Sequence, residues 1–208
     1  RKAKEAKAPG KPGELARAEI AVLDQVKDGL EKGTPVRMQR LGPEALAILS
    51  DLFLLTGKPV LYIANVDEDQ LTRADDPTVA MVKGLSAEEG ARCVVISGKV
   101  EAELSELPEA ERLDFLHSLG LAQPGLHRLV RASYELLGLS TFFTVGVDEC
   151  RAWTIRDGMT APQAAGTIHT DFERGFIKAD VQWWEDLTTL RTEAAVKEKG
   201  LLRIEGKE

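Results

Sequence analysis

Two groups of polar residues follow apolar runs of the sequence, at the point where each run ends. The first group follows residues 60–64 and the second follows residues 93–96. The groups comprise Asn65, Val66, Asp67 and Glu68, and Ser97, Gly98 and Lys99. In open parallel sheets, ligands bind just beyond the carboxyl ends of the strands. If both runs are neighbouring parallel strands, an amide, a hydroxyl and an ammonium group meet at one edge, where they can bind a nucleobase.

The two groups match the base-recognition corner of GTPase-like P-loop folds, in which one strand ends in Asn-Lys-x-Asp and the next in Ser-Ala-Lys. Guanine presents two donors to the short Asp carboxylate, whereas adenine presents an acceptor and a donor. Here Val66 replaces the Lys and the longer Glu68 replaces the Asp. The short carboxylate that accepts both guanine donors is therefore missing. Asn65 can still bond the N7 and 6-amino edge of adenine, and the backbone around Val66 can assist.

A simpler interpretation stands beside this one. Asn65 is also a common type of turn residue at a strand end, and Glu68 is then a solvated loop charge. Lys99 is equally well explained as a surface cation that flanks a helix. The residues alone leave both interpretations open.

The first two thirds of the chain predict an α/β fold. Residues 1–13 are typical of a loop or hinge. The next helix, 14–33, carries a narrow apolar stripe and ends at Gly33, so it can be one arm of an antiparallel coiled coil. The stripe consists of Leu15, Ile20, Leu23, Val26 and Leu30.

The runs 60–64 and 93–96 have no alternation, which is typical of central strands buried on both faces. Helices are expected over 43–55, 77–90, 101–107, 109–119 and 124–137. Strand, helix and strand in this order predict a parallel sheet with a right-handed crossover.

Residues from Leu139 onward predict a small α+β module. Strands 141–146 and 150–155 form a hairpin, and a further strand is expected over 176–181. Thr160 and Gln163 have the spacing of a capping box, and Thr170 is expected to cap a second helix. A helical or irregular part begins at the Trp183–Trp184 pair, of which one ring is expected to be exposed.

Other residues receive structural interpretations. Trp153 is expected in the core, and His169 is expected to bond the backbone at a helix entry. His117 and His127 lie on helices without a second ligand at the following turn, so a metal site is not predicted. The acidic residues Glu101, Glu103, Glu106, Glu109 and Glu111 are expected on a solvated helix face.

The 208 residues carry a formal charge of −7 that is unevenly distributed. Residues 1–40 hold ten basic and six acidic groups, so this segment alone is net basic. Such an arm binds nucleic acid through phosphate contacts, or is simply a solvated terminus. No apolar run approaches the roughly 20 residues of a membrane span. Cys93 and Cys150 form no CxxC motif, so a reducing, cytoplasmic compartment is expected.

The sequence resembles the YchF family of Obg-like ATPases. The matching stretches are KPVLYIANVDE (58–68), residues 138–181 with the specific block TAPQAAGTIHTDFERGFI (160–177), and the terminal LRIEGKE (202–208). The resemblance implies a partial P-loop G domain with a helical coiled-coil insertion, followed by an α+β β-grasp TGS domain. Residues 1–40 are then the coiled-coil arm and hinge, 41–138 the second half of the G domain, and 139–208 an incomplete TGS domain.

The resemblance also implies ATP hydrolysis with Mg²⁺, a preference for ATP over GTP, and association with the ribosome. Asn65 and Val66 match the adenine-contacting positions and Glu68 closes that motif. Ser97, Gly98 and Lys99 match the second base loop more loosely, because Gly98 replaces the usual Ala. No G-x-x-x-x-G-K-[ST] occurs in the sequence. Catalytic residues and Mg²⁺ ligands are therefore expected in an amino-terminal part before Arg1, and this chain alone is expected to be inactive.

The alternative is an RNA- or ribosome-binding module that acts through the basic arm and the TGS domain without catalysis. That function predicts salt-sensitive binding that survives Asn65→Ala and weakens when Lys2, Lys4, Lys7 and Lys11 are neutralised. A third possibility is a β-grasp module that binds another ligand. The expected partners are ATP and the ribosome or RNA, without a membrane, for a monomeric protein.

Overall fold

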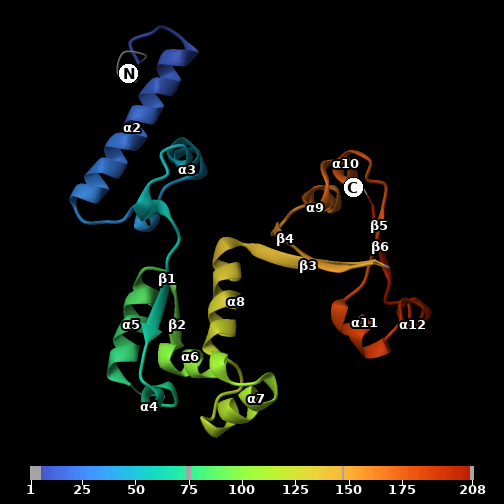
Figure 1. Cartoon of the computed structure of the whole chain (residues 1–208). Helices are drawn as coiled ribbons and strands as arrows, with labels where there is room; N and C mark the ends of the chain where they lie inside the picture. The colour runs from blue at the N-terminus through green and yellow to red at the C-terminus, as the bar shows by residue number, and fades with distance from the viewer. Residues whose placement is uncertain (1–5, 74–75, 147, 207–208) are drawn as a thin grey trace. The chain divides into compact units, whose positions relative to one another are not determined.

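The computed structural model describes residues 6–73, 76–146 and 148–206, and Figure 1 traces the chain through them. Lys2 and Lys4 of the predicted basic arm lie outside the described residues. The chain divides into two compact units, Arg1–Arg128 and Leu129–Glu208, which we describe one at a time. No helix within the described ranges has the length and apolar content that a membrane span requires.

The first unit opens with helix α2 (Lys11–Glu31), which starts earlier than predicted. Gly10 is its N-cap residue and Pro12 lies in its first turn, where the missing N–H costs nothing. Gly33 ends the helix with a φ of 77°, as expected. The predicted apolar stripe is only partly buried, since Val26 is 3% exposed but Leu15 is 66% exposed.

Three short helices follow α2 and form a small core with it. They are η1 (Val36–Met38), α3 (Pro43–Ser50) and η2 (Leu55–Gly57). The core contains Val26, Val36 and Leu49, with Leu23, Leu41 and Leu54 packed against them. The helix predicted over 43–55 is therefore too long: it ends at Ser50, and Phe53 adopts a positive φ of 49°.

The predicted parallel sheet is confirmed. Strand β1 (Leu61–Asn65) pairs in parallel with β2 (Arg92–Ile96), and α5 (Pro77–Glu88) packs against both (Figure 1). Short helix α4 (Glu68–Leu71) lies between β1 and α5 in the sequence. The prediction of strands buried on both faces is wrong for the described residues, because each strand has one neighbour there and Ile63 is 48% exposed.

Helices α6 (Gly98–Glu106), α7 (Glu109–Ser118) and α8 (Gly125–Leu137) follow β2. Val100, Leu104 and Leu116 form the second core of this unit. Helix α6 begins three residues earlier than predicted, so Gly98 and Lys99 belong to its first turn rather than to a loop.

The second unit begins within α8, and residues 129–137 of that helix are followed by two antiparallel strand pairs and four short helices among its described residues. The hairpin β3 (Leu139–Val145) and β4 (Cys150–Arg156) is followed by α9 (Ala161–Ile168) and α10 (Thr170–Arg174). Strand β5 (Ala179–Val181) pairs with β6 (Arg203–Glu205), and α11 (Trp184–Leu190) and α12 (Glu193–Glu198) lie between them in the sequence. The predicted hairpin and the capping box of Thr160 with Gln163 are both confirmed.

Several predictions for the second unit need correction. His169, not Thr170, caps α10, because its Nδ1 accepts from Asp171 N–H at 3.2 Å. The strand predicted over 176–181 begins only at Ala179. Trp153 is half-buried rather than in the core, and its Nε1 donates to Thr144 Oγ1 at 2.9 Å. Both members of the Trp pair are exposed, Trp183 by 61% and Trp184 by 56%.

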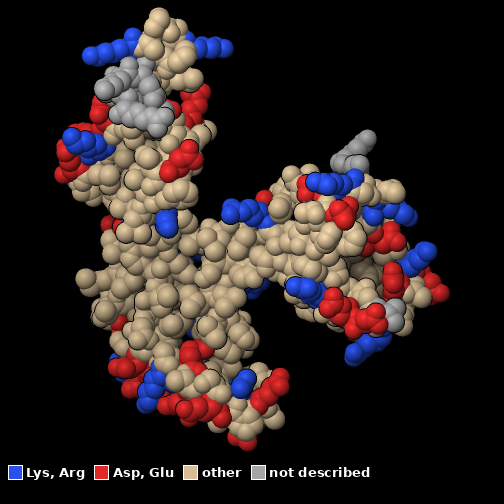
Figure 2. Space-filling model, turned by 45° about the horizontal axis from the view of Figure 1, so that its top comes forward, with Lys and Arg blue, Asp and Glu red and all other residues tan. Residues whose placement is uncertain are grey.

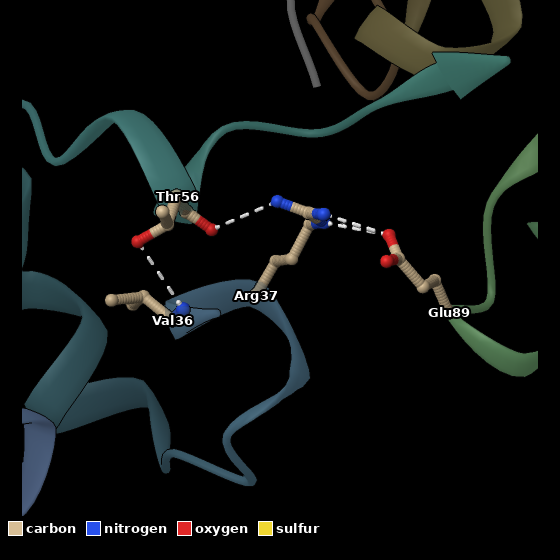
Figure 3. Close-up of polar contacts among 4 residues, drawn as sticks. All are labelled: Val36, Arg37, Thr56 and Glu89. Atoms are coloured by element: carbon tan, nitrogen blue, oxygen red, sulfur yellow. Dashed lines mark hydrogen bonds and ion pairs between the residues drawn. The ribbon is translucent and has the colours of Figure 1, made fainter. Parts of the chain in front are cut away.

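An ion pair joins the helical segment of the first unit to the end of α5 (Figure 3). Arg37 donates from Nη2 and Nε to the same Glu89 oxygen at 2.7 and 3.2 Å, and from Nη1 to the Thr56 carbonyl at 3.5 Å. The side chains of Arg37 and Glu89 are 22% and 15% exposed. The hydrogen bonds from Arg37 lower the pKa of Glu89, while burial and the Glu89 carboxylate raise the pKa of Tyr62.

We expect Glu89→Gln to lower the melting temperature at pH 7, because it removes the charge that Arg37 binds. The folded-state pKa of Glu89 lies below its unfolded value. This stabilisation is therefore complete above about pH 4.3 and is lost as the pH falls through the folded-state pKa. Thermal unfolding from pH 7 to pH 3 should show the variant and the wild type converging in acid. Asp28→Asn is the control, since Asp28 pairs with Lys32 on the surface; a constant gap across this range would contradict the assignment.

Candidate functional site

The parallel pairing of β1 and β2 brings the two predicted loops to the same edge of the sheet. Asn65, the last residue of β1, is in register with Ile96, the last residue of β2. The ladder continues one step further, because Val66 N–H donates to the Ile96 carbonyl at 2.9 Å. The residues that follow the two strands therefore begin side by side.

A hydrogen bond between the two loops organises this edge. Asn65 Oδ1 accepts from Gly98 N–H at 2.9 Å, although the residues are 33 positions apart in the sequence. Asn65 is exposed, and among the described residues its Nδ2 has no hydrogen-bond acceptor. The side chain thus keeps two N–H donors and one lone pair of Oδ1 for a ligand.

The first loop is held through the helix that follows it. Asp67 caps α4 in a capping box with Gln70, whose Oε1 accepts from Asp67 N–H at 3.1 Å. Gln70 Nε2 also donates to Asp76 Oδ2 at 2.8 Å. Asp76 in turn caps α5 by accepting from Thr78 and Val79 N–H at 2.9 and 3.1 Å. The Gln70 amide and these N–H groups lower the pKa of Asp76, a buried carboxylate.

The second loop presents backbone and a cation rather than a hydroxyl. Ser97 is 1% exposed, and its Oγ has no hydrogen-bond partner in the described part of the chain. Gly98 and Lys99 open α6. Lys99 lies 3.9 Å from Glu103 in an exposed pair, a contact too weak to fix its side chain. Of the predicted residues in this loop, Gly98 is the one bonded to Asn65.

Glu68 takes no part in the Asn65–Gly98 bond. It is the first residue of α4 and is exposed. Its side chain lines a hollow of about 380 Å³ together with Asp69, Thr72 and residues 118–120 at the end of α7. Within the described ranges, no hydrogen bond joins Glu68 to Asn65 or Gly98.

Three residues with a part in this site went unpredicted. The spacing of Asp67 with Gln70 and the sequence Asp76–Pro77 are both signals of helix starts, so Gln70 and Asp76 could have been found. Glu101 was expected on a solvated helix face, and this is wrong. Its carboxylate instead accepts from the N–H groups of Gly125 and Leu126 at 2.6 and 3.1 Å.

The described residues contain no group of three or more His, Cys, Asp or Glu side chains that could hold a metal ion. Figure 2 shows basic and acidic side chains mixed over the surface, without a broad basic face on the side drawn. The chemistry that the described edge offers is hydrogen bonding to a polar ligand through the Asn65 side chain.

We expect Asn65→Ala to raise the amide exchange rate of Gly98 about fivefold, the equivalent of about 1 kcal/mol for one hydrogen bond. Asn65→Asp should leave the rate near that of the wild type, because a carboxylate oxygen still accepts from the N–H group. Hydrogen exchange followed by NMR measures both. Equal rates in the wild type and Asn65→Ala would show that the bond does not form in solution.

Comparison with known proteins agrees with the resemblance in the sequence. The family model YchF-GTPase_C, described as a protein of unknown function (DUF933), matches residues 139–208. The "Ribosome-binding ATPase YchF" of Escherichia coli O157:H7 is 47% identical over 193 residues, which are 93% of this chain and 53% of that protein. The protein of the same name in Bacillus subtilis is 44% identical, over 91% of this chain and 52% of that protein. "Obg-like ATPase 1" of Caenorhabditis elegans is 39% identical, over 91% and 48%.

The fold agrees as well. The structure of the Schizosaccharomyces pombe YchF GTPase superposes with a TM-score of 0.81 at 33% identity, covering 94% of this chain and 52% of that one. The chain thus spans about half the length of the curated relatives it matches. The resemblance to the YchF family of Obg-like ATPases is therefore confirmed, over about half the length of these relatives.

Proposed function

We propose that this chain supplies the nucleobase corner and the carboxy-terminal unit of a ribosome-associated nucleotide hydrolase that prefers ATP to GTP. The observation that carries the proposal is the bond from Gly98 N–H to Asn65 Oδ1, which joins the two base loops. The names of the relatives, ribosome-binding ATPases, support the activity and the partner. A cytoplasmic, monomeric protein is part of the same proposal.

The domain layout proposed from the sequence belongs to this function. Residues 1–40 form the coiled-coil arm and hinge, 41–138 the second half of a P-loop G domain, and 139–208 an incomplete β-grasp TGS domain. The 21-residue helix α2 and the parallel pair β1–β2 support the first two assignments. The match of residues 139–208 to the YchF carboxy-terminal family model supports the third.

The preference for adenine follows from the hydrogen-bonding groups that remain free. Guanine presents two acceptors on this edge, N7 and O6, so it offers no donor to the second lone pair of Asn65 Oδ1, whose first lone pair accepts from Gly98 N–H. Adenine presents the N7 acceptor and the 6-amino donor. These match Asn65 Nδ2–H and the second lone pair of Oδ1. The backbone at Val66, Ser97 and Gly98 and the exposed side chains of Glu68 and Lys99 complete the proposed binding set, while the Ser97 hydroxyl is buried.

Hydrolysis requires groups that bind the phosphates. A P-loop supplies them in this class of enzyme, together with the Ser or Thr that holds Mg²⁺. The 208 residues contain no such motif, and their described part offers no metal-binding cluster. We therefore derive no catalytic step from this chain and expect no phosphate release from ATP and Mg²⁺ when it is purified alone.

Nucleotide binding can be followed at one atom group. Asn65 is the only asparagine in the sequence, so isotope-labelled asparagine gives a single side-chain amide signal. We expect ATP to shift this signal at lower concentration than GTP does. Asn65→Asp has no asparagine signal, so its ATP affinity is measured by titration calorimetry; it should be weaker about tenfold or more, because the donor to N7 is replaced by a carboxylate. GTP binding as tight as ATP would contradict the adenine preference, and no shift with either nucleotide would contradict the site.

Ribosome association has a separate test. We expect the chain to cosediment with ribosomes, and binding to fall as salt rises and in the double variant Lys7→Gln/Lys11→Gln. Lys27→Gln/Lys32→Gln is the matched control, since those side chains already pair with Glu31 and Asp28 on the same helix. Binding that survives Asn65→Asp while ATP binding is lost separates the two functions. Ribosome binding without any nucleotide binding would favour the non-catalytic alternative.

A further inference from the structure

The start of helix α8 is bonded to the first turn of helix α6. Glu101 accepts from Gly125 N–H with Oε1 at 2.6 Å and from Leu126 N–H with Oε2 at 3.1 Å. The first N–H groups of a helix have no partner within the helix, and a carboxylate there also interacts favourably with the helix dipole. Both oxygens of Glu101 are thus committed to α8.

The same turn of α6 carries Gly98. Glu101 N–H donates to the Ser97 carbonyl at 3.0 Å, which closes the turn that contains Gly98 and Lys99. The geometry of this turn therefore fixes the position of Gly98 N–H relative to the Glu101 carboxylate. On its other side, Gly98 N–H is bonded to Asn65.

Helix α8 is fixed in turn to the end of β2. Arg128, one turn into α8, donates from Nη2 to the Val95 carbonyl at 3.0 Å. A Cβ atom on Gly125 would lie 2.8 Å from Glu101 Oε1 and 3.0 Å from Ile96 Cγ2. The absence of a side chain at Gly125 lets α8 approach both the carboxylate and the last residue of β2.

We propose that Glu101 is a positioning residue of the nucleobase site, an inference that rests on the proposed nucleotide binding. Its carboxylate, held by the start of α8, fixes the first turn of α6 so that Gly98 N–H reaches Asn65 Oδ1. Asn65 is then oriented with Nδ2 toward the ligand. Glu101 itself does not contact the base.

The test compares Glu101→Gln with Glu106→Gln in the full 208-residue chain. Glu106 lies in the same helix, is exposed and has no hydrogen bond within the described residues. The carboxamide of Glu101→Gln can accept only one of the two N–H groups and turns a donor toward the other. We expect it to move the Asn65 side-chain amide signal without nucleotide and to weaken ATP binding about tenfold, which corresponds to about 1.4 kcal/mol. Glu106→Gln should do neither.

Gly125→Ala disturbs the contact between Glu101 and the start of α8 from the α8 side, because its Cβ would lie 2.8 Å from Glu101 Oε1. It should shift the Asn65 side-chain amide signal as Glu101→Gln does. Circular dichroism confirms that each variant folds, and either folded variant suffices for the comparison. An Asn65 signal and ATP affinity in both variants equal to those of Glu106→Gln would overturn the proposal. If the wild type binds no ATP, the proposed function fails, while the Asn65 signal in the nucleotide-free variants still decides the positioning role.

Discussion

The site depends on the register of one pair of parallel strands. Asn65 lies opposite Ile96, the last residue of β2. The Asn65 side chain can therefore reach the backbone N–H of Gly98, two residues further along the chain. A shift of one residue would turn every side chain of β1 to the other face of the sheet. The segment that contains α5 supplies the long crossover connection that a parallel pair requires. The bond between the loops is therefore a consequence of the sheet and of the helix that joins its strands.

Both loops are stabilised by the same physical device. A side chain close after each strand bonds to the start of a later helix, either directly or through one intermediate. Gln70 reaches the start of α5 through Asp76, and Glu101 reaches the start of α8. In each case the N–H groups that a helix cannot satisfy internally hold a loop in place. The residues that orient the site are thus separate from those that face a ligand.

Local chemistry made part of this structure predictable. The β-rich runs 60–64 and 93–96, and the helix between Pro77 and Gly90, contain their own start and stop signals, and the parallel sheet followed from their order. The placement of Asn65 and Gly98 at one edge followed from the same reasoning. The hydrogen bond between them, and which loop atoms it occupies, depends on the strand register, which no local pattern specifies.

Other features could not be read locally, because they depend on distant partners. From the sequence, Glu101 is indistinguishable from the other acidic residues of its helix face. Its role depends on α8, whose Gly125 and Leu126 N–H groups donate to its carboxylate. The burial of a strand is set by how many elements cover it, so apolar Ile63 remains half exposed. Gly98 and Lys99 lie in α6 rather than in a loop, and the residue types did not specify this, because glycine adopts many backbone conformations.

The pair of Arg37 and Glu89 makes the helical segment and the sheet mechanically continuous. Arg37 holds the Thr56 carbonyl with one nitrogen and Glu89 with two others, and Glu89 lies three residues before the first residue of β2. Packed protein interiors transmit displacement rather than absorb it. The Arg37–Glu89 pair therefore ties η1 to the residues that lead into β2, the strand whose carboxyl end precedes the second base loop.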